Sequence, residues 1–156
     1  MDPIINIKNL KATEQETIST IANWYFDEWE TPAVETFNRL ENLPNQKALL
    51  QVVASIDDKL IGTAGLANDV NLTQVYKKFN HLKPWVALIY TVPNYRKHGI
   101  GRLLLEAIEQ QAIEMGLKDI YLCTFTAESL YTKCGWEKLE RVNYKGYDSV
   151  IMKKRI

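Results

Sequence analysis

Seven residues in the second half of the chain, 96–102 (Arg-Lys-His-Gly-Ile-Gly-Arg), constrain its fold more than any other segment. They follow an apolar, strand-like run at 85–92 and lead directly into a segment with helical hydrophobic spacing. The first N–H groups of a helix have no intrahelical partner and carry partial positive charge, so such a loop suits a phosphate. Gly99 and Gly101 lack a Cβ, which lets a diphosphate approach the backbone.

The spacing of this loop is Arg-x-x-Gly-x-Gly. It matches neither the Gly-x-x-x-x-Gly-Lys-Ser/Thr phosphate loop nor the Gly-x-Gly-x-x-Gly dinucleotide fingerprint. Taken alone, the loop also fits an ordinary strand-to-helix turn in which the glycines serve only the geometry. Its interpretation as a diphosphate site therefore depends on the rest of the chain.

Length and charge narrow the class of protein. The 156 residues predict a single domain over 1–156, large enough to bury a core without disulfides. Nineteen basic residues balance nineteen acidic ones, whereas proteins that grip nucleic acid through phosphates usually show a basic excess. We therefore expect no nucleic-acid partner.

The cysteines and the beginning of the chain bear on metal binding and location. Cys123 and Cys134 form no C-x-x-C pair and have no clustered histidine, so we expect no metal site and two small buried thiols. Met1-Asp2-Pro3 shows no leader pattern, and no apolar run approaches the length of a membrane span. We expect a cytoplasmic protein with no membrane partner.

Hydrophobic periodicity predicts the order β-α-α-β-β-β-α-β-α-β-β. Thr13 and Glu16 match a capping box at the first helix, and Thr31 followed by proline matches the N-cap of the second. Residues 68–83 are polar and irregular, with some helical spacing. The strands are expected at 4–7, 48–56, 59–67, 85–92, 120–123, 136–144 and 147–152, and the helices at 13–29, 31–43, 103–115 and 127–133.

This order predicts an α/β (α+β) fold with a mixed sheet. The strand pairs in 48–67 and 136–152 read as antiparallel hairpins, while the helix after the glycines connects two parallel strands as a crossover. We expect a central sheet of about six to seven strands with helices on both faces.

Two segments resemble the signatures of a known family. Residues 92–104 resemble the acyl-coenzyme-A-binding motif of the GNAT (GCN5-related N-acetyltransferase) superfamily, and residues 127–136 resemble its second signature, an Ala-x-x-x-Tyr helix ending in Gly-aromatic. A helix and a strand separate them, as the family requires. The resemblance implies the GNAT acyl-CoA N-acyltransferase fold and acetyl-CoA as co-substrate.

On the donor side, the resemblance implies that the central strand splays from the next parallel strand and that pantetheine enters the gap as an added strand would. One strand amide would polarise the thioester carbonyl. Thr124 stands where many relatives have an Asn that contacts pantetheine. The implied coenzyme-binding residues are Tyr90, Thr91, Val92, Arg96, Lys97, His98, Gly99, Ile100, Gly101, Arg102 and Thr124.

Tyr131 matches the family's general acid, which protonates the departing thiolate. Without the resemblance, Tyr131 could equally be an aromatic that packs the short helix on the sheet. Many relatives carry a Glu base on the central strand, but residues 85–92 contain no carboxylate. Asp69, His81, Glu128 or a water chain are the candidates for removing the amine's proton.

The sequence says less about the acceptor site than about the coenzyme site. In this fold the first two helices and the loop before the central strand wall the acceptor site, so Trp24, Trp29 and Trp85 are candidates to shape it, with Asp69, His81 and Glu128 nearby. We expect acetyl transfer to a primary amine, either a small molecule or a protein N-terminus, by direct attack in a ternary complex. A coenzyme sensor without turnover and an acyltransferase with another donor or a hydroxyl acceptor are the alternatives. The chain would be a monomer or a homodimer.

Overall fold

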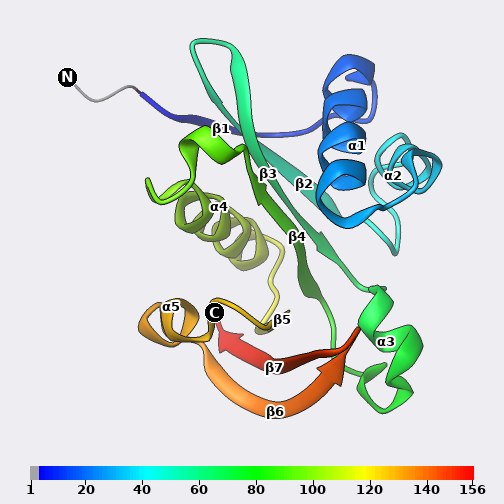
Figure 1. Cartoon of the computed structure of the whole chain (residues 1–156), viewed down its shortest axis with the longest axis vertical. Helices are drawn as coiled ribbons and strands as arrows, with labels where there is room; N and C mark the ends of the chain where they lie inside the picture. Colours follow the sequence, from blue (N-terminus) through cyan, green and yellow to red (C-terminus); the bar gives the residue numbers. More distant parts are fainter. Residues whose placement is uncertain (1–3) are drawn as a thin grey trace.

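A seven-stranded mixed sheet forms the centre of the molecule (Figure 1). The computed structural model describes residues 4–156, so Met1–Pro3, where the leader was sought, lie outside the described residues. The strand order is β1-β2-β3-β4-β5-β7-β6. The strands are β1 (Asn6–Asn9), β2 (Leu50–Ile56), β3 (Lys59–Ala67), β4 (Trp85–Thr91), β5 (Asp119–Thr124), β6 (Glu137–Tyr144) and β7 (Tyr147–Arg155).

The helices are those that the periodicity predicts, with short additions. They are α1 (Gln15–Trp29), α2 (Ala33–Leu40), α3 (Asn71–Val75), α4 (Ile100–Glu114) and α5 (Glu128–Lys133), and 3-10 turns lie at Lys77–Phe79 and Pro93–Tyr95. The helical spacing noted in 68–83 corresponds to α3 and the first of these turns. The described part of the chain contains no helix long and apolar enough to cross a membrane.

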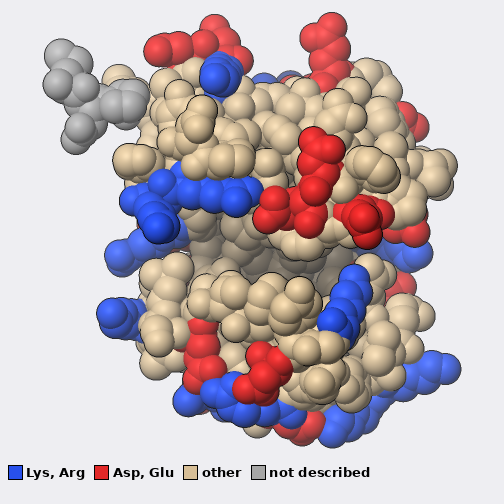
Figure 2. Space-filling view, in the orientation of Figure 1, with Lys and Arg blue, Asp and Glu red and all other residues tan. Residues whose placement is uncertain are grey.

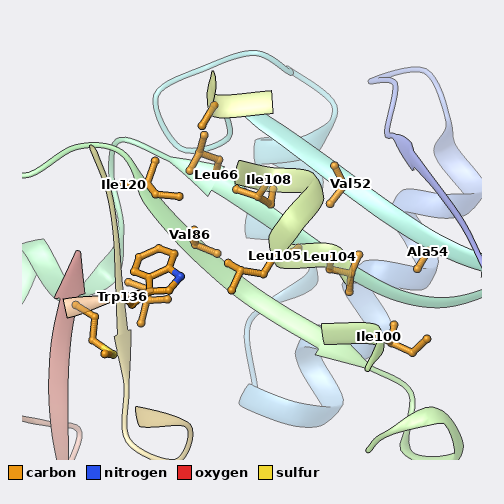
Figure 3. Packing of buried hydrophobic residues seen from close by; sticks show 14 of the residues in the cluster. Val52, Ala54, Leu66, Val86, Ile100, Leu104, Leu105, Ile108, Ile120 and Trp136 are labelled. Carbon is orange, nitrogen blue, oxygen red and sulfur yellow. The ribbon is translucent and has the colours of Figure 1, made fainter. Parts of the chain in front are cut away.

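Helices cover both faces of the sheet, as predicted. Figure 1 shows α4 on one face and the pair α1 and α2 on the other. On the first face, Leu104 and Ile108 of α4 are fully buried against strand residues such as Val52 and Leu66 (Figure 3). On the second face, Ile18 and Ile21 of α1 are equally buried in a separate cluster. The sheet is thus sandwiched between two apolar layers that hold it in place.

The two predicted N-caps are wrong. The structure starts α1 at Gln15, because Lys11 to Glu14 first form a turn in which the Glu14 carboxylate accepts the Lys11 N–H at 2.9 Å. Pro32, not Thr31, is the N-cap of α2. The Thr31 N–H instead donates to the Tyr25 carbonyl at 3.3 Å, where it helps to close the end of α1.

The sheet contains the parallel crossover that the sequence predicts. Strands β1 to β4 are antiparallel neighbours, β4 and β5 are parallel, and β5, β7 and β6 are again antiparallel. Within residues 4–156, Trp85 and Tyr121 form the one register pair between β4 and β5. The two parallel strands therefore meet where β4 begins and diverge beyond it.

Candidate functional site

The divergence of β4 from β5 opens the middle of the sheet. Past Trp85, the β5 side of β4 pairs with no strand among the described residues, so the backbone on that side is open to pairing with a ligand. The space-filling view in Figure 2 shows a hollow across the middle of this face, with acidic side chains on the right of its upper rim and basic ones on the left. This hollow is the candidate site.

The glycine loop leads from β4 into α4. Gly99 is the N-cap of α4 and has φ of 81°, a left-handed conformation that glycine adopts at little cost. A Cβ on Gly99 would meet nothing within 4 Å, so open space lies in front of the turn. No side chain in the described structure caps α4, and the N–H groups of its first turn remain available. The loop therefore fits an anionic group such as a diphosphate.

The charged residues of this loop differ in how free they are. Arg96 donates from Nε to the Thr91 carbonyl at 2.8 Å and pairs with Glu28 of α1 at 3.3 Å. Its guanidinium also lies 5.4 Å from the centre of the Tyr90 ring. Through these contacts the Arg96 side chain connects α1 to the end of β4. Lys97 and His98 of this loop are exposed.

Arg102, the last residue of the motif, pairs with Glu106 one turn further along α4 at 3.1 Å. Both side chains are more than half exposed, and such exposed helix pairs are weak. The ion pair therefore leaves the Arg102 guanidinium free to exchange its partner for a phosphate.

Tyr131 lies in α5, directly after β5. It packs against the main core cluster, and its ring centroid is 6.2 Å from that of Trp136. Burial raises the pKa of its hydroxyl above the ordinary value, with a smaller contribution from Cys134. The phenol is therefore protonated at neutral pH and can donate a proton.

The Thr124 hydroxyl has a structural partner on one side. Its Oγ1 accepts the Ala127 N–H at 3.1 Å and the Thr126 N–H at 3.4 Å, which shapes the entry to α5. The hydroxyl hydrogen of Thr124 is not used in these two contacts, so one donor remains for a ligand.

Aromatic side chains from α1 cover Tyr90 of β4. Trp24 stacks on the Tyr90 ring, and Trp29 approaches the same ring edge-on at 6.2 Å. Trp29 is 40% exposed, whereas Tyr90 is buried. The structure thus brings together Trp24, Trp29, Tyr90 and Arg96, all of which the sequence had singled out.

Three other predicted acceptor-site residues take no part in this aromatic cluster. Trp85 is 1% exposed in a core cluster, and its indole N–H donates to the Leu82 carbonyl at 2.7 Å. Its buried side chain offers no surface to an acceptor, so the expectation that Trp85 walls the acceptor site has no support here. Asp69 and His81 are exposed residues on either side of the segment that contains α3.

Glu128 is held by two cations. Its carboxylate pairs with Lys138 at 2.9 Å and with Arg141 at 2.6 Å. These hydrogen bonds lower the pKa of Glu128, that from Lys138 first. A carboxylate with a lowered pKa is a weak proton acceptor, which argues against Glu128 as the base.

Sequence reasoning missed a buried polar group behind β4. Gln51 and Thr63 are each 2% exposed or less. The Gln51 amide donates one hydrogen bond to the Tyr25 hydroxyl of α1 and another to the Thr63 hydroxyl. One signal was available, since Gln51 interrupts the apolar run of β2 and a buried amide needs hydrogen-bond partners.

A comparison with known protein families shows which family the chain belongs to. The acetyltransferase (GNAT) family matches residues 15–136, most of the chain and both signature segments. The chain belongs to the GNAT family. As a member of that family it is an acyltransferase, and the resemblance of the two motifs is confirmed.

Solved structures agree with this GNAT assignment. An aminoglycoside 6'-N-acetyltransferase complexed with coenzyme A has a TM-score of 0.75 at 16% identity, covering 96% of each chain. A GNAT-family acetyltransferase from Streptococcus pneumoniae has a TM-score of 0.71 at 20% identity, covering 98% of this chain and 99% of its own.

A chain of the NatC complex bound to Gag peptide and coenzyme A has a TM-score of 0.74 at 17% identity, covering 97% of this chain and 98% of its own. At these identities the likeness concerns the fold. A search among curated protein sequences returned no match.

Proposed function

We propose that this GNAT protein transfers an acetyl group from acetyl-CoA to a primary amine in a ternary complex. The observation that carries the proposal is the divergence of β4 from β5 after their single pair, Trp85 and Tyr121, next to the open first turn of α4. The diverging strands offer unpaired backbone groups to the pantetheine amides, and the glycine turn offers N–H groups to the diphosphate.

The donor site uses few side chains. Lys97 and Arg102 supply positive charge around the diphosphate, His98 lies in the same loop, and Gly99 and Gly101 keep the turn open. The hydroxyl hydrogen of Thr124 adds a donor at the β5 side of the gap. The coenzyme-bound relatives described above support this placement, since they share the fold over nearly their whole length.

In the reaction, the neutral amine nitrogen attacks the thioester carbonyl carbon and forms the new C–N bond. The C–S bond then breaks, and the coenzyme leaves as a thiolate that takes the proton of the Tyr131 hydroxyl. The attacking nitrogen loses its proton, and Tyr131 recovers one from solvent, so the products are the N-acetyl amine and free coenzyme A. Because burial raises the pKa of Tyr131, this phenol remains a donor at neutral pH.

Removal of the amine's proton is assigned to solvent water at the mouth of the hollow. β4 carries no carboxylate, and Glu128 is engaged by Lys138 and Arg141. Asp69 and His81 are exposed and can accept the proton from such a water. This arrangement makes the concentration of neutral amine the main determinant of the rate.

The acceptor is a small cationic amine or a protein N-terminus. The acidic side chains on the right of the upper rim in Figure 2 favour a cation there, and the rings of Trp24 and Trp29 over Tyr90 favour an amine on an apolar or aromatic-stacking frame. Aminoglycosides and a peptide are named with two of the structural relatives, and both present amines.

The test is thiol release from acetyl-CoA with a panel of polyamines, aminoglycosides and peptides, together with calorimetric titration of coenzyme A. Saturable thiol release with at least one amine is expected. Coenzyme binding without turnover over the whole panel would indicate a sensor instead. Faster turnover with propionyl-CoA or succinyl-CoA would assign another donor, and faster turnover with alcohols another acceptor.

A further inference from the structure

β4 carries a bulge at Leu88. The register with β3 pairs Thr63 with Tyr90 but Gly65 with Ala87, so two residues of β4 lie opposite one of β3. Leu88 has φ of 54°, a left-handed conformation that a residue with a Cβ rarely adopts. A bulge interrupts the regular hydrogen bonds of its strand, so other contacts must maintain its shape.

A buried side chain from α1 provides such a contact. The Tyr25 hydroxyl donates to the Leu88 carbonyl at 2.8 Å, and Tyr25 has no exposed surface. Gln51 Nε2 donates to the Tyr25 hydroxyl oxygen at 2.9 Å and to Thr63 Oγ1 at 2.8 Å. Thr63 Oγ1 in turn donates to the Val52 carbonyl at 2.8 Å. We call Tyr25, Gln51 and Thr63 the bulge network.

Each polar group of the bulge network has a fixed role as hydrogen-bond donor or acceptor. The amide of Gln51 gives both of its hydrogens, and the hydroxyls of Tyr25 and Thr63 each give their single hydrogen to a carbonyl. Burial raises the pKa of Tyr25 to about 12, so its hydroxyl stays a donor over the working range of an enzyme. The bulge carbonyl thus has a permanent, fixed partner.

Gly65 makes room for this arrangement. A Cβ built on Gly65 would lie 2.5 Å from Gln51 Oε1, closer than any tolerated contact. The side chain of Gln51 therefore lies directly over the glycine of the neighbouring strand. A methyl group there would displace Gln51 without removing any polar group.

The bulge lies at the candidate reaction centre. It falls between the one β4–β5 pair, at Trp85, and Tyr90, which Trp24 and Trp29 cover from the acceptor side. The backbone of this stretch has no strand partner on its β5 side within the described structure. Any displacement of the bulge would move the backbone groups that face the thioester.

We propose that Tyr25, fixed by Gln51 and Thr63, positions the bulged segment of β4 for the acetyl thioester. The inference rests on the function proposed above. Tyr25 is a positioning residue, since it contacts the backbone of β4 and not the reacting atoms. A positioning role predicts a selective loss of turnover, because misplaced hydrogen-bond groups weaken the transition state more than they weaken coenzyme binding.

The test compares steady-state kinetics and coenzyme affinity of the wild type and Tyr25→Phe, which removes one oxygen atom from a buried ring. We expect kcat to fall about tenfold or more, as for loss of one preorganised contact, and the Kd of coenzyme A to change less than about threefold. Gly65→Ala should give a similar split between kcat and Kd, since its methyl group displaces Gln51.

Tyr76→Phe is the matched control. The Tyr76 hydroxyl also donates to a backbone carbonyl, that of Asn143, but it connects the segment after α3 to β6. Its removal should leave kcat unchanged even where it lowers the melting temperature. All assays are run at a temperature at which circular dichroism shows each variant to be folded.

The outcomes separate the two proposals. An active wild type with an unchanged kcat in Tyr25→Phe overturns the positioning role and leaves the acetyltransferase proposal intact. Equal losses of kcat and coenzyme affinity also overturn it, because they indicate general damage to the fold. A wild type without turnover on any amine or donor overturns both proposals.

Discussion

The indole ring of Trp24 stacks on the phenol ring of Tyr90, with centroids 5.2 Å apart and planes inclined by 25°. One ring belongs to α1 and the other to the central strand β4, and the guanidinium of Arg96 lies over the same phenol. Helix α1, the proposed wall of the acceptor site, therefore packs directly on β4, the proposed donor strand. Changes in this stack should affect acceptor binding first.

Replacing Trp24 by Ala should raise the KM for the amine several-fold and leave the Kd of coenzyme A nearly unchanged. Loss of the stacked pair should also lower the free energy of unfolding by about 1 kcal/mol, in addition to the effect of the lost apolar burial. Trp24→Phe keeps an aromatic ring in the stack and should retain most of the acceptor affinity. A larger effect on coenzyme binding than on the amine KM would place Trp24 on the donor side.

Gly99→Ala should weaken coenzyme binding. The left-handed φ of 81° costs a residue with a Cβ about 1 kcal/mol, although the space in front of Gly99 is open. Relaxation of this turn would move the N–H groups proposed to bind the diphosphate, and isothermal titration would record the loss of affinity.

Gly146→Ala is the matched control for this change. Gly146 has φ of 85° and equally open surroundings, but it lies in the β6–β7 turn. The two variants should lose similar stability in chemical denaturation. If Gly146→Ala weakens coenzyme binding as much as Gly99→Ala, the glycine turn before α4 has no special part in binding.

Tyr131→Phe should lower kcat by about a hundredfold or more, the usual contribution of a general acid, with little change in coenzyme affinity. The reason is that only the proton of the hydroxyl is needed, while the ring keeps its contact with Trp136. Single-turnover measurements separate acetyl transfer from product release. A variant with normal transfer and altered coenzyme affinity would make Tyr131 a packing residue.

The pH profile follows from the two proton transfers. With an alkyl amine of pKa near 10.4, kcat/KM should rise about tenfold per pH unit up to pH 9, because only the neutral amine reacts. Burial raises the pKa of Tyr131 above its ordinary value of 10.0, so deprotonation of this acid should not reduce the rate below pH 10. A plateau that begins near pH 6 to 7 would instead indicate a histidine base, with His81 the first to replace.

Much of the fold followed from local patterns. The hairpin turns at Asp57-Asp58 and Lys145-Gly146 have the positive φ values that such tight turns require. The two helix starts were misplaced because turns made by neighbouring backbone groups compete with Thr13 and Thr31 for the capping position. Local sequence shows which residues can cap a helix, but the approach of the chain decides which one does.

For the site, the sequence predicts the order of strand, glycine turn, helix and Tyr131 along the chain. Backbone conformation and family signatures are local properties, so they can be recognised without the tertiary structure. Tertiary structure decided the rest. It buried Trp85, paired Glu128 with two cations, turned Arg96 toward Glu28 and brought Tyr25 to the bulge of β4. These contacts join residues far apart in the chain, and their partners depend on how α1 packs on the sheet, which no local pattern specifies.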